Sequence, residues 1–562
     1  MPKLSYDPSR YYRYDEMVQF LHQAVEAYPQ LVRLESIGKS YEGRDLWLAV
    51  VTNTQTGPDS EKPAYWIDAN IHAVELCGSA VALYTIWYLL ENYKTDRLVT
   101  HLLDTRAFYI LPRMSPDGAE YVLRTQKWVR SSVRLYPFNE IKDGLHPEDI
   151  NGDGEILQMR VEDPLGEWKV SQKDPRLMLK RQPDDIDGPF YRLYVEGIFL
   201  NYDGFRKEVA PTPYGLDLNR NFPHEWQVES NQQGAGEYPT SEPEVRAVVE
   251  FFYKHRNICG ALTYHTTSGV ILRPYSGKPD TAFPHFDLAV YKAIGERGTD
   301  ATGYRCVSVN DEFRYDKNKP ITGVFDDWAY DNYGIFAYTT ELWSIAAHAG
   351  IEVKDYIQFF RERSEEDELK LLRWQDRELN GAGFQNWTPF EHPQLGRVEI
   401  GGWRLLYTWV NPPPKFLPEE CHKNMLFSFR HAVASPRLRI REFRAQPVGA
   451  DLYRISLVLE NDGWLPTHVS QRALEKKLVQ PIQVELHLPA SATLELGKPK
   501  QEIEHLAGAA TTLCQPWTSY HSFRGSSKDT EKKIEWLVRG RGKLSVIVKS
   551  ERAGVCRATL EL

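Results

Sequence analysis

His72 and Glu75 stand three residues apart, where an apolar stretch at residues 65–71 gives way to a longer one at 79–93. Residues at this spacing share one face of a helical turn, so an imidazole and a carboxylate can reach the same metal ion. Catalytic zinc takes three protein ligands, in some enzymes two His and one Glu, and keeps a fourth position for water. The pair therefore requires one more histidine downstream. On its own it also fits a carboxylate that caps a helix beside a buried histidine.

Two other ionisable residues close apolar runs that predict strands. His265 ends the run 260–265 and can supply the third ligand, although a histidine at a strand end is more often structural. Glu341 follows the run 334–340. A carboxylate there must be paired, exposed or placed in a cleft, and ligands of open α/β sheets gather at strand ends. Beside zinc it would accept a proton from water and donate it to a leaving amine; otherwise it caps the strand in solvent.

Guanidinium groups occur at two further places. Asn219 and Arg220 are adjacent within the segment LDLNRNFP, residues 216–223. A guanidinium grips a carboxylate with two hydrogen bonds, and an adjacent amide can add a donor. Arg130 could stabilise an oxyanion formed at the metal. The plainer interpretations are a surface pair of Asp217 with Arg220 and a solvated charge at Arg130.

Alternating strand and helix signals surround these residues. β-favouring apolar runs predict strands at 34–37, 46–52, 65–71, 107–112, 260–265, 304–309 and 335–342. Helical patterns lie at 15–28, 79–93, 241–255, 283–297, 326–330 and 353–379. Ser241 followed by Glu244 is the signature of a capping box that opens a helix. The alternation predicts an α/β domain over residues 1–385, a mixed twisted sheet flanked by helices.

Residues 131–213 interrupt this alternation, because they are rich in Asp, Pro, Gly and Arg, and they predict an insertion. Within it Asp149, Asn151 and Asp153 offer oxygens at alternate positions, as calcium loops do. The twelfth position is Arg160 instead of the bidentate Glu that such a loop needs. An Asn/Asp/Gly-rich turn is therefore favoured over a Ca2+ site.

Short β-rich runs separated by Pro, Gly and Asn follow at residues 395–562 and predict a β-sandwich accessory domain. A chain of 562 residues also exceeds what one core usually supports. The net charge of −9 argues against a nucleic-acid partner, and no apolar run is long enough to suggest a signal peptide or a membrane partner. Six cysteines without C-x-x-C spacing indicate reduced thiols, so we expect a cytoplasmic protein.

Taken in order, five motifs of this chain resemble those of the zinc metallocarboxypeptidase family, carboxypeptidase A/B type. They are His72-x-x-Glu75, Pro116-Asp117-Gly118, the segment GLDLNRNF at 215–222, the strand-end His265, and Thr339-Thr340-Glu341-Leu342. The segment GKSYEGR at 38–44 also resembles the entry of that family. The resemblance covers roughly residues 10–380, and the ordered set is far more specific than any one motif.

The resemblance implies one Zn2+ per chain, held by His72, Glu75 and His265. It implies that Glu341 is the general base and acid, and that Arg130 polarises the scissile carbonyl. It further implies that Asn219 and Arg220 hold the free C-terminal carboxylate of a peptide substrate.

The chain also departs from the family pattern. Val74 stands where the family often has an arginine just before the zinc-binding Glu, and Tyr315 is the nearest candidate for the mobile active-site tyrosine. Asp326 falls where B-type enzymes carry the aspartate that selects basic C-terminal residues; it could equally be an acidic cap on a short helix. The insertion could lie over the cleft.

These features predict a zinc-dependent carboxypeptidase that removes C-terminal residues from peptides. One alternative is another zinc amide hydrolase, such as an N-acyl amino acid deacylase or a peptidase of γ-glutamyl cell-wall peptides, because the predicted carboxylate clamp suits those substrates too. The other is a zinc-retaining binding module without catalytic activity.

Overall fold

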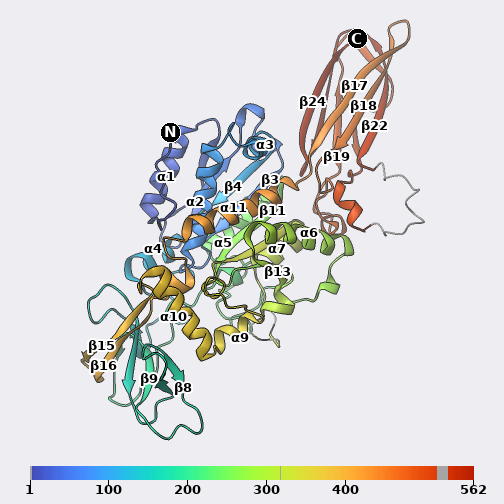
Figure 1. Cartoon of the computed structure of the whole chain (residues 1–562). Coiled ribbons are helices and arrows are strands. Elements are labelled where there is room, and N and C mark those ends of the chain that lie inside the picture. The colour runs from blue at the N-terminus through green and yellow to red at the C-terminus, as the bar shows by residue number, and fades with distance from the viewer. Residues whose placement is uncertain (1–2, 315, 317, 320, 515–528) are drawn as a thin grey trace.

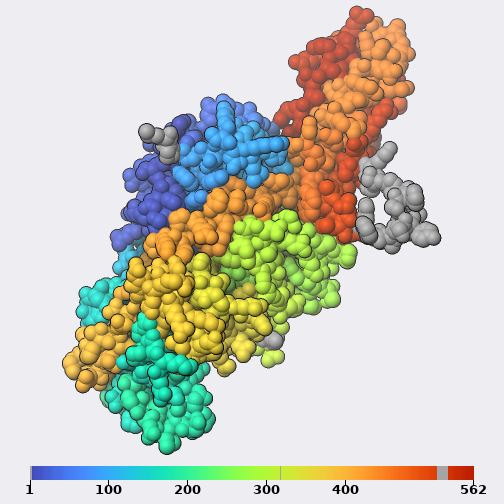
Figure 2. Space-filling model, viewed as in Figure 1, coloured from blue at the N-terminus to red at the C-terminus, as the bar shows by residue number. Residues whose placement is uncertain are grey.

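The computed structural model describes residues 3–314, 316, 318–319, 321–514 and 529–562. A central body lies between two smaller parts, a sheet built largely from the insertion and a C-terminal sandwich (Figure 1). These two parts project from opposite ends of the body, as the space-filling view also shows (Figure 2).

The central body is organised around an eight-stranded mixed sheet of order β1-β2-β4-β3-β11-β14-β12-β13. Its strands are β1 (Val32–Lys39), β2 (Asp45–Val51), β3 (Ala64–Ala69), β4 (Ala107–Leu111), β11 (Ile258–Thr266), β12 (Val270–Arg273), β13 (Arg305–Ser308) and β14 (Phe336–Leu342). The four central strands β4, β3, β11 and β14 run parallel. They are almost wholly buried, which is why the sequence shows them as continuous apolar runs.

Helices cover both faces of this sheet. The helices of the body are α1 (Tyr14–Ala27), α2 (Leu76–Glu91), α3 (Arg97–Thr105), α4 (Pro116–Thr125), α5 (Pro243–Lys254), α6 (His285–Thr302), α7 (Phe325–Trp328), α8 (Ile345–His348), α9 (Tyr356–Arg361), α10 (Glu365–Leu379) and α11 (Leu417–Val433). One of them, α10, packs instead against Phe384 and Trp403 of the inserted sheet. On β3, Trp66 packs against Phe252 of α5, with ring centroids 4.9 Å apart. The neighbouring Tyr65 points to the opposite face, where its hydroxyl lies 2.9 Å from Nδ1 of His431 on α11.

Two predicted helices differ from the structure. Helix α5 begins at Pro243, and the Ser241 hydroxyl donates to Glu242, so the predicted capping box is wrong. Glu244 is buried and accepts a hydrogen bond from the backbone N–H of Tyr41. The predicted single helix at 353–379 is two helices, α9 and α10, because Ser364 caps a new helix after the break.

The insertion forms a regular sheet, with the order β15-β16-β6-β9-β7-β8. Its strands are β6 (Gln158–Glu162), β7 (Trp168–Val170), β8 (Met178–Lys180), β9 (Phe190–Val195), β15 (Phe384–His392) and β16 (Gly396–Trp403), and a separate pair joins β5 (Gly144–Pro147) to β10 (Gly197–Leu200). The hairpin β15–β16 follows the motif region in sequence and pairs with β6. Two segments far apart in the chain therefore build this sheet together.

The loop at residues 149–154, for which the sequence favoured a turn over a Ca2+ site, contains Asx-type hydrogen bonds in this structure. The Asp149 carboxylate accepts hydrogen bonds from the backbone N–H groups of Gly152 and Gly154 at 2.7 and 2.8 Å. The buried Glu196 accepts N–H groups from Ile150 and Leu157 on either side. The loop thus has a structural explanation in its own hydrogen bonds.

Helix α11 belongs to the central body. Its apolar residues Leu417, Cys421, Met425 and Phe427 join the main core, and the helix packs against α2 and α6. The boundary expected near residue 395 is therefore too early. The structure places it between α11 and the first strand of the sandwich.

The C-terminal part is a β-sandwich of two four-stranded antiparallel sheets, β17-β18-β22-β20 and β21-β19-β23-β24. The strands are β17 (Leu438–Gly449), β18 (Leu452–Asn461), β19 (Ile482–His487), β20 (Ala492–Leu496), β21 (Lys500–Ile503), β22 (Glu531–Gly540), β23 (Lys543–Ser550) and β24 (Gly554–Glu561). Their inner residues form a core of their own. The fully buried Arg552 attaches this part to the body by donating to the carbonyl oxygens of Tyr333 and Gly334 at 2.5 and 3.0 Å. Among the described residues, no helix has the length and apolar character needed to span a membrane.

Candidate active site

The register of three parallel strands gathers the predicted site residues at one edge of the sheet. His265 on β11 lies directly opposite Glu341 on β14. The neighbouring strand β3 ends at Ala69, so the loop that follows it carries His72 and Glu75 to the same edge. Carboxyl ends of parallel strands are where open α/β sheets bind ligands.

His72, Glu75 and His265 converge on one point. The Nδ1 atoms of the two histidines are 3.0 Å apart, and Glu75 Oε1 lies 2.9 Å from His72 Nδ1. Glu75 Oε2 lies 3.1 Å from His265 Nδ1. One possible ligand atom from each residue lies within 4.8 Å of the other two, and all three residues are buried.

This donor set fits zinc. Two imidazole nitrogens and one carboxylate are ligands that zinc accepts. Buried polar atoms normally have hydrogen-bond partners, yet among the described residues His265 Nε2 has none, and the 3.1 Å contact of Glu75 Oε2 with His265 lacks the geometry of a hydrogen bond. A cation held between the three side chains would satisfy the Glu75 oxygen.

Asp217 orients His72, a role that the sequence did not reveal. Nε2 of His72 is 3.1 Å from Asp217 Oδ1, a contact that fixes the ring and turns Nδ1 toward Glu75 and His265, where it can bind a metal. Arg130 donates from Nε to Asp217 Oδ2 at 2.9 Å. Burial opposes ionisation, but Arg130, Arg220 and His72 hold the pKa of Asp217 well below its usual value. The expected Asp217–Arg220 pair exists only as a longer contact of 3.9 Å.

Glu341 lines a cavity of about 290 Å3 together with Glu75 and Arg130. Burial raises the pKa of Glu341 well above its usual value and Glu75 raises it further, whereas Arg130 and Arg220 lower it. A raised pKa means that this carboxyl group holds a proton more readily than an exposed glutamate does. Arg130 is partly exposed, so it faces the cavity while holding Asp217.

Asn219 and Arg220 lie on the turn Leu218–Arg220, which Asp217 caps by accepting the backbone N–H of Asn219 at 2.9 Å. The side-chain oxygen of Asn219 accepts the backbone N–H of Phe325 at 2.8 Å, so its NH2 group remains as a donor. The side chain of Arg220 is 11% exposed, and its charge acts on Glu341 and Asp326. The structure thus brings this pair to the side of Glu341.

Asp326 is buried at the start of α7, where its Oδ2 accepts the Thr339 hydroxyl at 3.3 Å. Thr339 precedes Glu341 by two residues on β14, so both side chains lie on one face of the strand. Burial raises the pKa of Asp326 to about 6, against the effect of its hydrogen bonds and Arg220. It also accepts the N–H of Asp327 at 3.1 Å, but it lies inside α7, whose N-cap residue is Val324, so it does not cap the helix.

Two further residues were singled out from the sequence, Tyr315 and Val74. Tyr315 lies outside the described residues. Val74 lines the cavity, so an apolar group occupies that part of its wall. Helix α9 contributes Ile357, Phe360 and Arg361 to the same cavity, and no motif pointed to them.

Comparison with known proteins agrees with this geometry. A family model described as zinc carboxypeptidase matches residues 17–151 and 169–363, and a domain of unknown function matches residues 437–561. Carboxypeptidase A6 of Mus musculus is 26% identical over 60% of this chain and 61% of its own length. A zinc carboxypeptidase of Saccharothrix mutabilis subsp. capreolus is 24% identical over 62% of this chain and 65% of its own length.

The chain therefore spans less than two thirds of the length of these two relatives. Among solved structures, that of thrombin activatable fibrinolysis inhibitor aligns with a TM-score of 0.44 at 19% identity, covering 76% of this chain and 74% of the other. The two matched segments of the family model contain His72, Glu75, His265 and Glu341. With more than half of its residues matched to that model, the chain belongs to the zinc carboxypeptidase family.

Proposed function

We propose that this protein is a zinc-dependent carboxypeptidase that hydrolyses the C-terminal peptide bond of peptides. The observation that carries the proposal is the convergence of His72, Glu75 and His265 at a strand edge, with Glu341 in register beside them. Membership of the zinc carboxypeptidase family supports it.

In this proposal, His72, Glu75 and His265 hold one zinc ion, and Asp217 fixes the ring of His72. Zinc, when bound, supplies a Lewis acid that polarises a carbonyl group and makes water a stronger acid.

Glu341 accepts a proton from the attacking water, because it faces the cavity and its carboxylate can act as a general base there. It then donates that proton to the nitrogen of the departing residue. Arg130 lines the same cavity and donates to the carbonyl oxygen as negative charge develops there.

Asn219 and Arg220 hold the terminal carboxylate of the substrate. The guanidinium group supplies charge and two donors, and the NH2 group of Asn219 supplies another. This clamp makes the enzyme an exopeptidase, since only the last residue of a chain carries a free carboxylate beside the scissile bond.

A preference for basic C-terminal residues is a finer proposal that rests on Asp326. A Lys or Arg side chain entering beside Asp326 would pair with its carboxylate and lower its pKa from about 6. The carboxypeptidase B2 relatives, 23% identical, give this preference only weak support. An Asp326→Asn variant should lose at least about tenfold in the ratio of rates on C-terminal Arg and C-terminal Leu peptides.

We also propose that the protein acts in the cytoplasm, because its six cysteines are all free thiols in the described residues. Fractionation of the source cells tests this proposal, and recovery from an oxidising compartment would overturn it.

Profiling the purified protein on a peptide library and on N-acyl amino acids, with and without chelator, tests the main proposal. We expect release of single C-terminal amino acids, one zinc per chain and loss of activity on chelation. Cleavage of N-acyl amino acids or γ-glutamyl peptides alone would assign another amide hydrolase. Zinc retained with no cleavage of any substrate would assign a binding module.

A further inference from the structure

The C-terminal part places a short helix, α12 (Gln471–Glu475), against the central body. This helix packs on α6 and on the helical turn Ala329–Tyr333, which continues α7 directly. Asp287 of α6 accepts two backbone N–H groups at the start of α12, at 2.7 and 2.9 Å. The proposed mechanism makes no use of this contact, although α7 carries Asp326, the proposed specificity residue.

Arg472 and Lys476 bring two positive charges from the C-terminal part to Asp331 in that turn. Asp331 is buried, and its carboxylate oxygens lie 3.2 Å from Arg472 Nε and 3.1 Å from Lys476 Nζ. The Tyr275 hydroxyl donates to Asp331 at 3.2 Å and accepts from Arg472 at 3.1 Å. A buried carboxylate needs such partners, because removing one leaves its charge without compensation. The C-terminal part therefore fixes the position of Asp331.

His224 links Asp331 to the segment that carries the proposed carboxylate clamp, residues 216–224. Its Nδ1 lies 3.5 Å from Asp331 Oδ2 and 2.9 Å from the side-chain oxygen of Asn332. The His224 side chain is buried, so its ring has little freedom to turn away from these partners. One end of the clamp segment is thus joined to the turn that α12 contacts.

Three hydrogen bonds join the clamp segment to the residues that lead into α7. The backbone N–H of Phe222 donates to the Gly323 carbonyl at 3.0 Å, and the Gly323 N–H donates to the His224 carbonyl at 3.1 Å. The side-chain oxygen of Asn219 accepts the N–H of Phe325 at 2.8 Å. These segments therefore form one unit, with His224 at one end and the clamp residue Asn219 at the other.

We infer that Arg472 and Lys476 are positioning residues for the carboxylate clamp. They hold Asp331, Asp331 holds His224, and the clamp segment is thereby kept where it can bind the terminal carboxylate of a substrate. This inference rests on the proposed exopeptidase function and gives the C-terminal part a role in substrate binding. Neither positive residue touches the substrate. Small displacements of a binding group are costly, so loss of either charge weakens the hold on the carboxylate.

The preference for a free C-terminal carboxylate is the readout that tests the inference. It is the affinity for a peptide divided by the affinity for the same peptide with a C-terminal amide. Calorimetry on the full-length Glu341→Gln protein, loaded with zinc, measures both affinities because the peptide is not consumed. We expect a ratio of at least about tenfold, because the amide lacks the charge that the clamp binds. Adding Arg472→Gln or Lys476→Gln should lower the ratio about fivefold, a usual size for coupling through a packed network.

Lys477→Gln is the matched control, because it removes the same charge from the next residue along the chain. Lys477 is exposed, whereas Lys476 pairs with the buried Asp331. The control should leave the ratio at the value of the Glu341→Gln protein. Arg472→Lys keeps a positive charge beside Asp331 and should recover part of the lost preference.

Thermal unfolding of each variant separates positioning from a purely structural role. A lower unfolding temperature with an unchanged ratio would overturn the inference, and so would a ratio near one before any charge is removed. The expected ratios in a protein whose parent form cleaves no peptide would leave the inference standing and defeat the proposed hydrolysis. Peptide hydrolysis by the parent, with a ratio that neither charge variant changes, would defeat the inference alone.

Discussion

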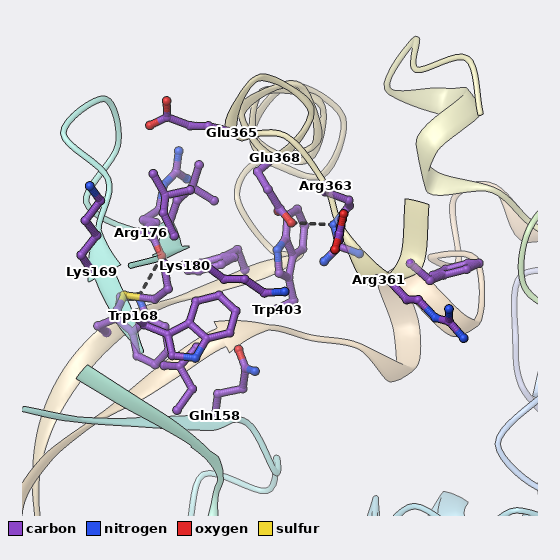
Figure 3. A pocket seen from close by; sticks show the side chains of 18 of the residues that line it. Gln158, Trp168, Lys169, Arg176, Lys180, Arg361, Arg363, Glu365, Glu368 and Trp403 are labelled. Carbon is purple, nitrogen blue, oxygen red and sulfur yellow. Dashed lines mark hydrogen bonds and ion pairs between the residues drawn. The ribbon is translucent and has the colours of Figure 1, made fainter. Parts of the chain in front are cut away.

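Two neighbouring cavities of this protein lie against different parts of a β-sheet. The catalytic cavity lies at the ends of parallel strands, where register fixes His265 opposite Glu341. A cavity of about 550 Å3 lies over one face of the inserted sheet (Figure 3), where Gln158 on β6, Trp168 on β7 and Trp403 on β16 line it, and it shares Phe360 and Arg361 with the catalytic cavity. Chemistry needs particular side chains at fixed positions, and the register of parallel strands supplies them at the strand ends. Changes at the strand ends should therefore affect catalysis more than changes on the face of the inserted sheet.

His265→Ala should have the largest effect on activity, because it removes one of the three proposed zinc ligands. Loss of an outer partner of a ligand already costs about 10- to 100-fold in metal affinity, so loss of a ligand should cost more. We expect zinc to fall below about a tenth of an ion per chain, and kcat/KM to fall at least about 10³-fold. Metal analysis of the gel-filtered variant decides the matter; a full complement of zinc would show that the ligand set is wrong.

Glu341→Gln separates chemistry from metal binding at the same strand end. General acid–base catalysis contributes about 10²- to 10⁴-fold, so kcat should fall about 10³-fold. Zinc should remain at one per chain, because Glu341 is not among the converging ligands. A variant as active as the parent would assign the proton transfer to another group.

Burial of the Asp68 carboxyl group in the central sheet should make the free energy of unfolding depend on pH. Asp68 on β3 accepts hydrogen bonds from Trp66 and Thr263, yet burial raises its pKa from 3.8 to about 6. The folded state binds the Asp68 proton more tightly than the unfolded state does. The contribution of this proton to the free energy of unfolding is therefore fully present below pH 3.8 and is lost as the pH rises through 6. The loss is at most roughly 3 kcal/mol. Urea unfolding should show Asp68→Asn gaining stability relative to the parent as the pH rises from 4 to 8, whereas a control variant at a surface position, Ile186→Ala, shows no such trend because Ile186 is 85% exposed.

Asp217→Asn tests whether the Asp217 carboxylate orients the ring of His72 for zinc binding. The amide can no longer accept from both His72 and Arg130 as a carboxylate does. We expect zinc affinity to fall about 10- to 100-fold, as measured by competition with a chelator. Unchanged affinity would mean that packing alone orients the His72 ring.

The smallest effect should come from Phe360→Ala, where the two cavities meet. Phe360 is 42% exposed, so its removal should leave the fold intact. We expect KM for an octapeptide to rise about fivefold while kcat stays within twofold, because uniform binding is lost without loss of transition-state contacts. A fall in kcat of similar size would place Phe360 in the chemical step instead.

The sequence predicted the strands of the site well, because β3, β11 and β14 are buried on both faces and therefore show unbroken apolar runs. It also predicted which side chains gather, because His72 and Glu75 are close in sequence and the remaining motifs follow in order. It did not reveal Asp217, whose function depends on a contact with a residue 145 positions away.

Two parts of the fold, α11 and the inserted sheet, could not be predicted from the sequence for a different reason. The apolar stripe of α11 is interrupted by buried polar residues, and Glu420 and His431 find partners in residues distant in sequence, among them the hydroxyls of Tyr304 and Tyr65. The inserted sheet depends on pairing between β6 and β16, which lie more than 200 residues apart in the chain. Neither partner can be recognised from local periodicity.

The late position of α11 has a consequence for synthesis on the ribosome. A nascent chain of 385 residues already contains every residue of the site, yet the helix that covers α2 and α6 has not been made. Until that helix emerges, the apolar faces of α2 and α6 have no permanent cover, and chaperones could hold the growing chain there. Activity should therefore appear only after residue 433 has emerged from the exit tunnel, well after the last catalytic side chain has done so.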